Sequence, residues 1–334
     1  MTERATIAQG VQIGVESAPG TAVAAGKRLG SIGFNLGPKP EVTSQRPMGQ
    51  KYPNLQILGK EWTTISIDGA PCYTELPFLF SSLISAGTVT EYLDGATHTG
   101  AFRWVFDSNP YGDDAPKTFT IEQGSAAHAG RAPGCLITGT EFVLSRKEVS
   151  LSGDGIGALF EDDITLTATP TRLPQVPVRP AELTFYADPT AAALGTTKLT
   201  RAISGGFKLG NRYAPLWVVD AALPSYAATV EAEPELSATL LQVADDEGMA
   251  NLTHLRNGDT RFFRFEAVGP RIYDGTVTDY FHKLTIDIAG QVSDVKEPSD
   301  EDGVYAIEWT FGGIVDSTWN KAFHIEVVTT TATL

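Results

Sequence analysis

Apolar and polar residues alternate along several segments of this chain, and such alternation is the pattern of half-buried β-strands. In WTTISID, Ile65 and Ile67 alternate with Ser66 and Asp68, and VSLSGDGIG and VYAIEWTFGG alternate similarly before they end in glycines. A compact apolar run, ELPFLFSSLI, follows the first of these strands and predicts a short α-helix that covers one sheet face. The pattern therefore predicts a mainly β fold with short helices.

The two halves of the chain resemble each other. RLGSIGFNLG (28–37) and RAISGGFKLG (201–210) are identical at six of ten positions without a gap. The segments that follow keep one order, because WTTISIDGAP precedes ELPFLFSSLI as SYAATVEAEP precedes ELSATLLQVA, and each pair predicts a strand followed by a helix. This order predicts a duplicated unit; the alternative is that two unrelated β-rich domains share such cues.

A cluster of prolines near the middle of the chain predicts an extended linker, since proline cannot donate a main-chain hydrogen bond. We therefore expect a first domain at 1–170, a linker at 171–182 and a second domain at 183–334. The first domain carries a long polar excursion at 38–61, where the second half has a shorter segment. Long loops in compact domains are usually functional or mobile, so this excursion is a candidate contact segment.

Charge and composition restrict the class of protein. Acidic residues outnumber basic ones by 40 to 25 over 334 residues, which argues against a surface built to hold DNA, RNA or anionic lipid. The start of the sequence lacks the layout of a signal peptide, and its apolar runs are too short to span a bilayer, so we expect a soluble, non-secreted protein. Cys72 and Cys135 are too few for a disulfide framework, and two reduced, buried thiols are expected.

No catalytic motif has the spacing that its chemistry needs. Gly20 and Gly26 precede Lys27, but they are one residue too far apart for a phosphate-binding loop, and Arg28 stands where a metal-binding hydroxyl is required. GDGIGA follows a strand, as a dinucleotide fingerprint does, but acidic residues and another alternating segment follow it instead of a helix. The histidines have no metal-ligand spacing. The sequence predicts no enzyme activity and no cofactor or metal site.

Several segments together are similar to one protein family. They are the opening VQIGVESAPGTAVAAGKRL, the strand and apolar run ISIDGAPCYTELPFLFSSLISAGTV, the segment KTFTIEQG and the close EDGVYAIEWTFGGIVDSTWNKAFHIEVV. With these segments the chain resembles the major tail (tail tube) proteins of long, non-contractile-tailed bacteriophages. The similarity spans nearly the whole chain.

The resemblance implies two tandem tail-tube-type antiparallel β-sandwich/barrel domains, each with a short α-helix, the first with an N-terminal arm and the second with a C-terminal arm. Family rings contain six such domains, so three copies of this chain would form a trimeric ring with pseudo-sixfold symmetry, and the rings would stack into a tube. The implied partners are other copies of the chain, the tape-measure protein, and the tail-tip and tail-terminator proteins. Phage DNA would pass through the lumen without sequence-specific binding. The implied location is the virion tail, after synthesis in the bacterial host cytoplasm, with no membrane partner.

The resemblance also suggests roles for particular residues. The 38–61 excursion would make ring-to-ring contacts through Arg46, Gln50, Lys51 and Tyr52. The lumen would be lined by acidic residues, for which we select Glu122, Glu266 and Asp287. An N-terminal arm that reaches a neighbouring subunit would contain Gly14, Glu16, Gly20 and Thr21.

Two other classes of function stay open. One is a two-domain β-sandwich binding module on a virion or cell surface, which would need an exposed aromatic platform for a receptor or carbohydrate. The other is an enzyme with a dispersed active site, which would need acidic residues that converge in a cleft.

Overall fold

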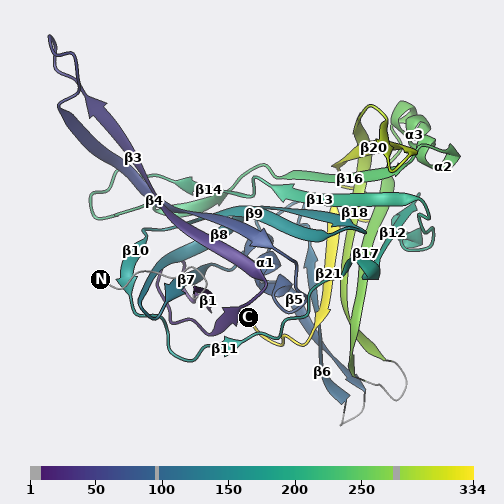
Figure 1. The fold of residues 1–334 in the computed structure, drawn as a ribbon, viewed down its shortest axis with the longest axis horizontal. Helices are drawn as coiled ribbons and strands as arrows, with labels where there is room; N and C mark the ends of the chain where they lie inside the picture. Colours follow the sequence, from purple (N-terminus) through teal and green to yellow (C-terminus); the bar gives the residue numbers. More distant parts are fainter. Residues whose placement is uncertain (1–8, 95–97, 274–278) are drawn as a thin grey trace.

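The computed structural model describes residues 9–94, 98–273 and 279–334, and in these ranges the chain is mainly β, as predicted (Figure 1). The strands are β1 (Gly10–Val15), β2 (Lys27–Leu29), β3 (Ile32–Gln45), β4 (Leu55–Gly69), β5 (Thr88–Asp94), β6 (His98–Asp107), β7 (Phe119–Ser125), β8 (His128–Ser145), β9 (Val149–Gly157), β10 (Glu161–Ile164), β11 (Thr171–Arg172), β12 (Leu183–Asp188), β13 (Ala202–Gly210), β14 (Tyr213–Leu216), β15 (Ala228–Glu231), β16 (Glu235–Val243), β17 (Arg261–Tyr273), β18 (Tyr280–Val295), β19 (Ser299–Glu301), β20 (Val304–Gly313) and β21 (Phe323–Thr329).

Three short α-helices accompany the strands: α1 (Leu76–Leu83), α2 (Asp246–Met249) and α3 (Asn251–Asn257). All eight residues of α1 are buried, and the ribbon shows the helix enclosed by strands (Figure 1). Pro77 lies in the first turn of α1. Main-chain N–H groups in a first turn have no acceptor within the helix, so proline, which lacks an N–H, is tolerated there. The predicted helix in ELPFLFSSLI is therefore confirmed as a core element.

Eight antiparallel strands form one continuous row in the order β3-β4-β9-β8-β13-β16-β20-β18. The first four and the last four share an arrangement, because each set places its first, second, fourth and third strands along the chain side by side. Phe34 of β3 and Phe207 of β13, which match in the sequence comparison, are both buried. We call this set of strands the eight-strand row.

A second layer packs on the eight-strand row. This layer has two parts. One part is the paired strands β12-β17-β18-β21-β6-β5, and the other is the paired strands β2-β1-β7-β8-β10. β8 and β18 belong to both layers, since their first parts pair with β7 and β17 and their last parts pair within the row. The buried side chains between the layers form one hydrophobic cluster, which includes Phe80, Phe142, Phe207 and Trp309.

The predicted second helix in ELSATLLQVA is wrong, because residues 235–243 form the strand β16. Ala238 and Leu240 face the core, while Ser237 and Thr239, which alternate with them, are only half-buried. This is the two-residue period of a strand, and it was obscured by the adjacent leucines 240 and 241. The helical segment of the second half lies just after it, in α2 and α3.

The polar excursion at 38–61 is a long β-hairpin and not a loop. β3 continues to Gln45 and β4 begins at Leu55, so only 46–54 form the turn. Every residue from 38 to 60 is exposed, and the hairpin projects away from the rest of the ribbon (Figure 1). We call residues 38–61 the hairpin arm. Pro38 and Pro40 fit there because β3 is an edge strand of this chain.

The proline-rich segment 171–182 is extended and lies against the turn before α1. The Tyr73 N–H donates to the Val176 carbonyl over 3.0 Å, and the Val178 N–H donates to the Pro71 carbonyl over 2.9 Å. The Thr74 hydroxyl donates to the Pro174 carbonyl over 2.6 Å. Leu173 and Val178 are buried, so this segment is held to the body of the protein.

Glu75, just before α1, fixes the start of β3. Its side chain is buried, and its two carboxylate oxygens accept hydrogen bonds from the N–H groups of Gly30, Ser31 and Ile32 at 2.8–3.2 Å. Charge-assisted bonds to main-chain donors are stronger than neutral ones. One carboxylate thus holds the main chain where the eight-strand row begins.

We expect Glu75→Gln to lower the free energy of unfolding by about 1–3 kcal/mol, because the amide nitrogen would face main-chain donors. Urea unfolding at neutral pH measures this change. The matched control is Glu247→Gln at an exposed position of α2, which should unfold like the wild type. Equal stability of the Glu75 variant and this control would contradict the assigned role.

Candidate functional site

One face of the eight-strand row is polar and carries glycine, serine and charged residues. Directly paired residues run across all eight strands, and paired residues point to the same side of a sheet. One such line is Gly33, Asp68, Ser152, Glu141, Lys208, Ser237, Gly312 and Gln291. None of these residues is buried, whereas their neighbours Phe34, Ile67, Leu151, Phe142 and Phe207 are. We call this surface the polar face.

The polar face carries more negative than positive charge. Asp68, Asp154, Glu141 and Glu235 are exposed on it, and Glu308 is half-buried. In the line of paired residues, the basic member is Lys208 of β13. Its Nζ lies 3.7 Å from a carboxylate oxygen of Glu235. A surface of small polar groups with excess negative charge repels phosphate and offers no basic grip on it.

The eight-strand row has two open edges. β3 pairs with β4 and, among the described residues, with no strand on its other side. In β18, residues 290–295 pair with β20, and no described strand continues along the opposite side of 291–295, although α3 contacts β18 there and Gln291 Nε2 donates to the Gly258 carbonyl over 2.9 Å. Unpaired strand edges are templates for pairing with another chain.

The junction inside the row shows how two such edges meet. Thr140–Ser145 of β8 pair with Ser204–Leu209 of β13 at six consecutive positions. At its centre Phe142 pairs with Phe207, their ring centroids 6.3 Å apart in the core, while Glu141 pairs with Lys208 on the polar face. This junction joins the two four-strand sets by main-chain hydrogen bonds and a shared core.

The four residues predicted for ring stacking lie together at the tip of the hairpin arm. Arg46, Gln50, Lys51 and Tyr52 are all exposed in or next to the 46–54 turn. Lys51 Nζ is 5.5 Å from the centroid of the Tyr52 ring. Met48 and Tyr52 are respectively 103% and 70% exposed, so the tip presents large apolar groups that no described residue covers.

The base of the hairpin arm is braced by the second half of the chain. Trp62 of β4 meets Trp217 edge-on at 5.8 Å, and Lys60 Nζ lies 5.4 Å from the Trp217 ring. The Ser225 hydroxyl donates to the Glu61 carbonyl over 2.7 Å. These contacts fix the direction of the arm relative to the eight-strand row.

The acidic residues selected for a lumen are not on the polar face. Glu122 and Asp287 are only 2% exposed. Glu122 accepts hydrogen bonds from Thr167, and Asp287 accepts two from Arg264 at 2.7 and 2.8 Å. Glu266 lies 2.7 Å from Lys283 Nζ. All three therefore lie in the second layer, Glu122 and Asp287 buried and Glu266 half-buried, each with a partner in its own chain.

The residues selected for an N-terminal arm fold onto their own chain. β1 pairs with β7 and β2, so Gly14 lies opposite Thr120 in the sheet. The buried Glu16 carboxylate accepts bonds from the Gly20 and Gly134 N–H groups and from the Thr120 hydroxyl. Gly20 and Thr21 are exposed in the turn that Glu16 closes. The expectation of an arm is corrected for these residues; residues 1–8 lie outside the described part.

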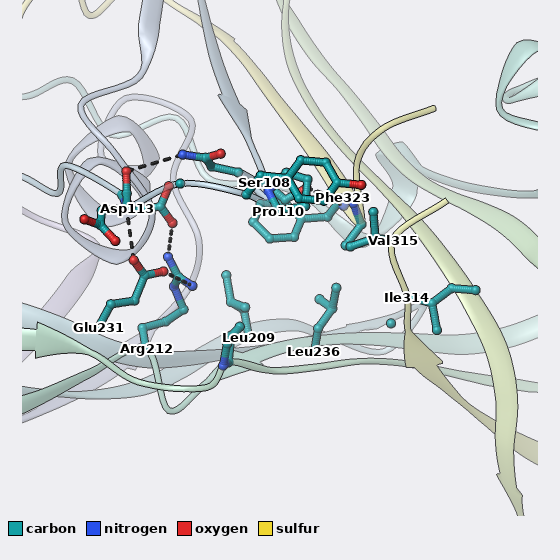
Figure 2. Close-up of a pocket in the computed structure, with 17 residues that line it drawn as sticks. Ser108, Pro110, Asp113, Leu209, Arg212, Glu231, Leu236, Ile314, Val315 and Phe323 are labelled. Atoms are coloured by element: carbon teal, nitrogen blue, oxygen red, sulfur yellow. Dashed lines mark hydrogen bonds and ion pairs between the residues drawn. The ribbon is translucent and has the colours of Figure 1, made fainter. Parts of the chain in front are cut away.

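A cavity of about 570 Å³ lies at the end of β13 (Figure 2). Arg212 reaches into it and forms ion pairs with Asp114 and, at 3.2 Å, with Glu231. Arg212 also donates to the Leu83 carbonyl over 3.2 Å. Burial alone would lower the pKa of Arg212. Interactions with nearby groups, including the Asp114 and Glu231 carboxylates, outweigh burial and raise this pKa. Two carboxylates thus share one guanidinium, which is the arrangement of a structural ion-pair network.

Across the described ranges, no group of three or more His, Cys, Asp or Glu residues is arranged to hold a metal ion. In the same ranges, no helix is both long and apolar enough to cross a membrane. No protein-family model matches the sequence, and no curated protein is a significant match to it.

Sequence reasoning missed the residues of the polar face. The alternation in WTTISID did show that Ser66 and Asp68 share a side of their strand. It did not show that Glu141 and Lys208, 67 positions apart in the chain, would be neighbours on that side. Strand order decides which side chains meet, and a single sequence holds little signal for it.

We expect Asp287→Asn to lower the free energy of unfolding by about 3 kcal/mol, because it leaves the Arg264 guanidinium without its charged partner. Asp154→Asn on the polar face is the matched control and should stay within about 0.5 kcal/mol of the wild type. Chemical denaturation of the two variants compares them. A reversed order of stabilities would mean that Asp287 is not a structural residue.

Proposed function

We propose that this protein is a structural subunit that assembles into rings and that the rings stack into a tube, as in the tails of long, non-contractile-tailed bacteriophages. The observation that carries the proposal is the eight-strand row, in which one internal junction joins two matching sets and leaves one open edge on each outer side. An open edge at each side of a sheet is what ring formation requires.

The two four-strand sets are proposed to be copies of one duplicated domain, the first at 1–170 and the second at 183–334. Their shared strand order supports this, as does the ungapped match between 28–37 and 201–210 at the start of β3 and β13. The second layer supports it too, because β1-β7-β8 in the first half matches β12-β17-β18 in the second. Three chains would then supply the six domains of a ring.

Neighbouring copies would meet as β8 and β13 meet. When the two four-strand sets are matched strand by strand through their paired residues, Lys208 in the second set corresponds to Asn35 in the first. In the same match, Glu141 in the first set corresponds to Asp294 in the second. The last part of β18 in one copy would therefore lie beside the first part of β3 in the next, with Asp294 opposite Asn35. Ring closure would satisfy the main-chain groups of both edges.

The polar face would line the lumen. Its small side chains would leave the wall smooth, and its acidic residues would keep DNA from adhering while the genome passes. The same lumen would hold the tape-measure protein before DNA delivery. Tail-tip and tail-terminator proteins would cap the ends of the tube in the virion, after assembly in the bacterial host cytoplasm.

A carbohydrate- or receptor-binding module has less support. Such a module would present aromatic rings to solvent. Trp104 and Trp309 are buried, and Trp62, Trp217 and Trp319 are half-buried. Exposed apolar side chains occur instead on the hairpin arm and on 216–230, and most of them are aliphatic, which fits contact with protein.

We expect the purified protein to form hollow rings or tubes with a threefold repeat as its concentration rises. Negative-stain electron microscopy across a concentration series, with and without tail-tip complex as an initiator, tests this. Compact monomers under every condition, initiator included, would reject the proposal.

The hairpin arm allows stacking to be tested apart from ring formation. Lys51→Glu combined with Tyr52→Ala should leave single rings but shorten or abolish tubes, because the tip would lose its charge and its exposed ring. Lys147→Glu, in the exposed turn between β8 and β9, is the control. Tubes of normal length from the tip variant would exclude the tip from stacking.

We expect the triple variant Asp68→Lys, Glu141→Lys and Asp154→Lys to bind double-stranded DNA once assembled, because it turns the lumen wall basic. Filter binding at low salt should show retention that falls steeply as salt is raised. The wild-type assembly is the control. Equal DNA retention by the two assemblies would contradict the expectation that the charge of the polar face controls contact with DNA.

A further inference from the structure

A groove of about 520 Å³ runs beside the open edge of β3. It is lined by Gly30, Ser31 and Ile32 at the start of the strand, and by the exposed Arg28 and Arg172. Neither guanidinium forms an ion pair with a described residue. Asp68 is the one carboxylate in the lining, and Asn35 donates a hydrogen bond to it. The groove is therefore basic at the end where Arg28 and Arg172 lie.

The other open edge of the eight-strand row ends in an acidic connection. Residues 294–302, which lead from β18 to β20, contain five carboxylates and one lysine. Lys296 is already paired with Glu308 at 2.6 Å. Glu297 and Glu301 are exposed and have no ion pair among the described residues. This connection, which we call the acidic turn, is one of the most negatively charged stretches of the chain.

The internal junction shows where such a turn goes when two edges pair. The β8–β9 turn occupies the position in the first set that the acidic turn occupies in the second. Ser145, the last residue of β8 before that turn, pairs with Ser204 of β13, and Arg146 in the turn donates to the Pro180 carbonyl over 3.4 Å. Because Ser204 corresponds to Ser31 in the sequence match, the acidic turn of one copy would reach the groove of the next.

We propose that the acidic turn of one copy of this chain docks into the groove at Arg28 and Arg172 of a second copy, an inference that rests on the ring proposed above. The groove, the charges of opposite sign and the internal junction place the same two segments together. The contact lies beside the paired edges, so it adds an electrostatic contribution to each joint between copies.

The contact also distinguishes the joint between copies from the junction inside a copy. The β8–β9 turn is basic, with Arg146 and Lys147, whereas the acidic turn has the opposite sign. Arg28 and Arg172 would repel a basic turn. The groove therefore accepts the acidic turn that follows β18 and rejects the basic turn between β8 and β9. Complementary and like charges together give such selectivity.

The test is the concentration at which trimers form, measured by sedimentation and native mass spectrometry. Arg28→Glu with Arg172→Glu should raise that concentration by roughly tenfold or more, because the groove would repel the acidic turn. Glu297→Lys with Glu301→Lys should have the same effect. All four changes in one chain should restore assembly, because the two charges are exchanged. Arg256→Glu, at an exposed position of α3 outside the groove, is the control.

Far-ultraviolet circular dichroism and thermal unfolding would confirm that each variant is folded. Trimers of the groove variant at the wild-type concentration, or a fourfold variant that is no better than the double variants, would overturn this contact and leave the ring standing. A wild-type chain that stays monomeric at every concentration and with initiator would overturn the ring and the contact together.

Discussion

Thr140–Ser145 of β8 and Ser204–Leu209 of β13 pair along six positions, and this main-chain hydrogen bonding makes one row out of two four-strand sets. Phe142 and Phe207 pack beneath the pairing, so the core is continuous where the sheet is continuous. The alternation of strands then makes the opposite surface continuous as well, and Glu141 meets Lys208 on it. The polar face and the two open edges all follow from this one junction.

The two outer edges of the eight-strand row lack a strand partner, although on β3 the Ile32 N–H donates to Glu75 and the Leu36 N–H donates to Gln123, each over 2.8 Å. Residues 32–37 of β3 contain no proline or lysine, the residues that commonly block an edge, and 291–295 of β18 contain neither. In contrast, Pro38 and Pro40 begin where β3 leaves the row and enters the hairpin arm. Proline is thus absent along the segment that matches the internal junction and present beyond it. A second copy is the occupant that this distribution favours.

The sequence indicated local structure better than it indicated neighbours. Alternation located β4, β9 and β20, and the two segments of the ungapped match extend into β3 and β13, because both signals act over a few residues. The strand β16 was mistaken for a helix, and the hairpin arm was expected to be a loop, since adjacent leucines and prolines hide a two-residue period. The candidate lumen residues Glu122, Glu266 and Asp287 lie away from the polar face for another reason. Acidic character does not reveal which layer a strand joins, and in the second layer each carboxylate has a partner.

The two halves differ in the hairpin that connects their first two strands, and this difference sets the symmetry of any stack. In the first half that connection is the projecting hairpin arm; in the second it is β14 and β15, whose Trp217 lies against Trp62 at the base of the arm. The shorter hairpin therefore supports the longer one and does not project beside it. A ring of three chains would carry six similar domains around its lumen but only three arms. Lateral pairing could follow a pseudo-sixfold arrangement, while contact through the arms would be threefold, so successive rings would have three equivalent orientations and not six.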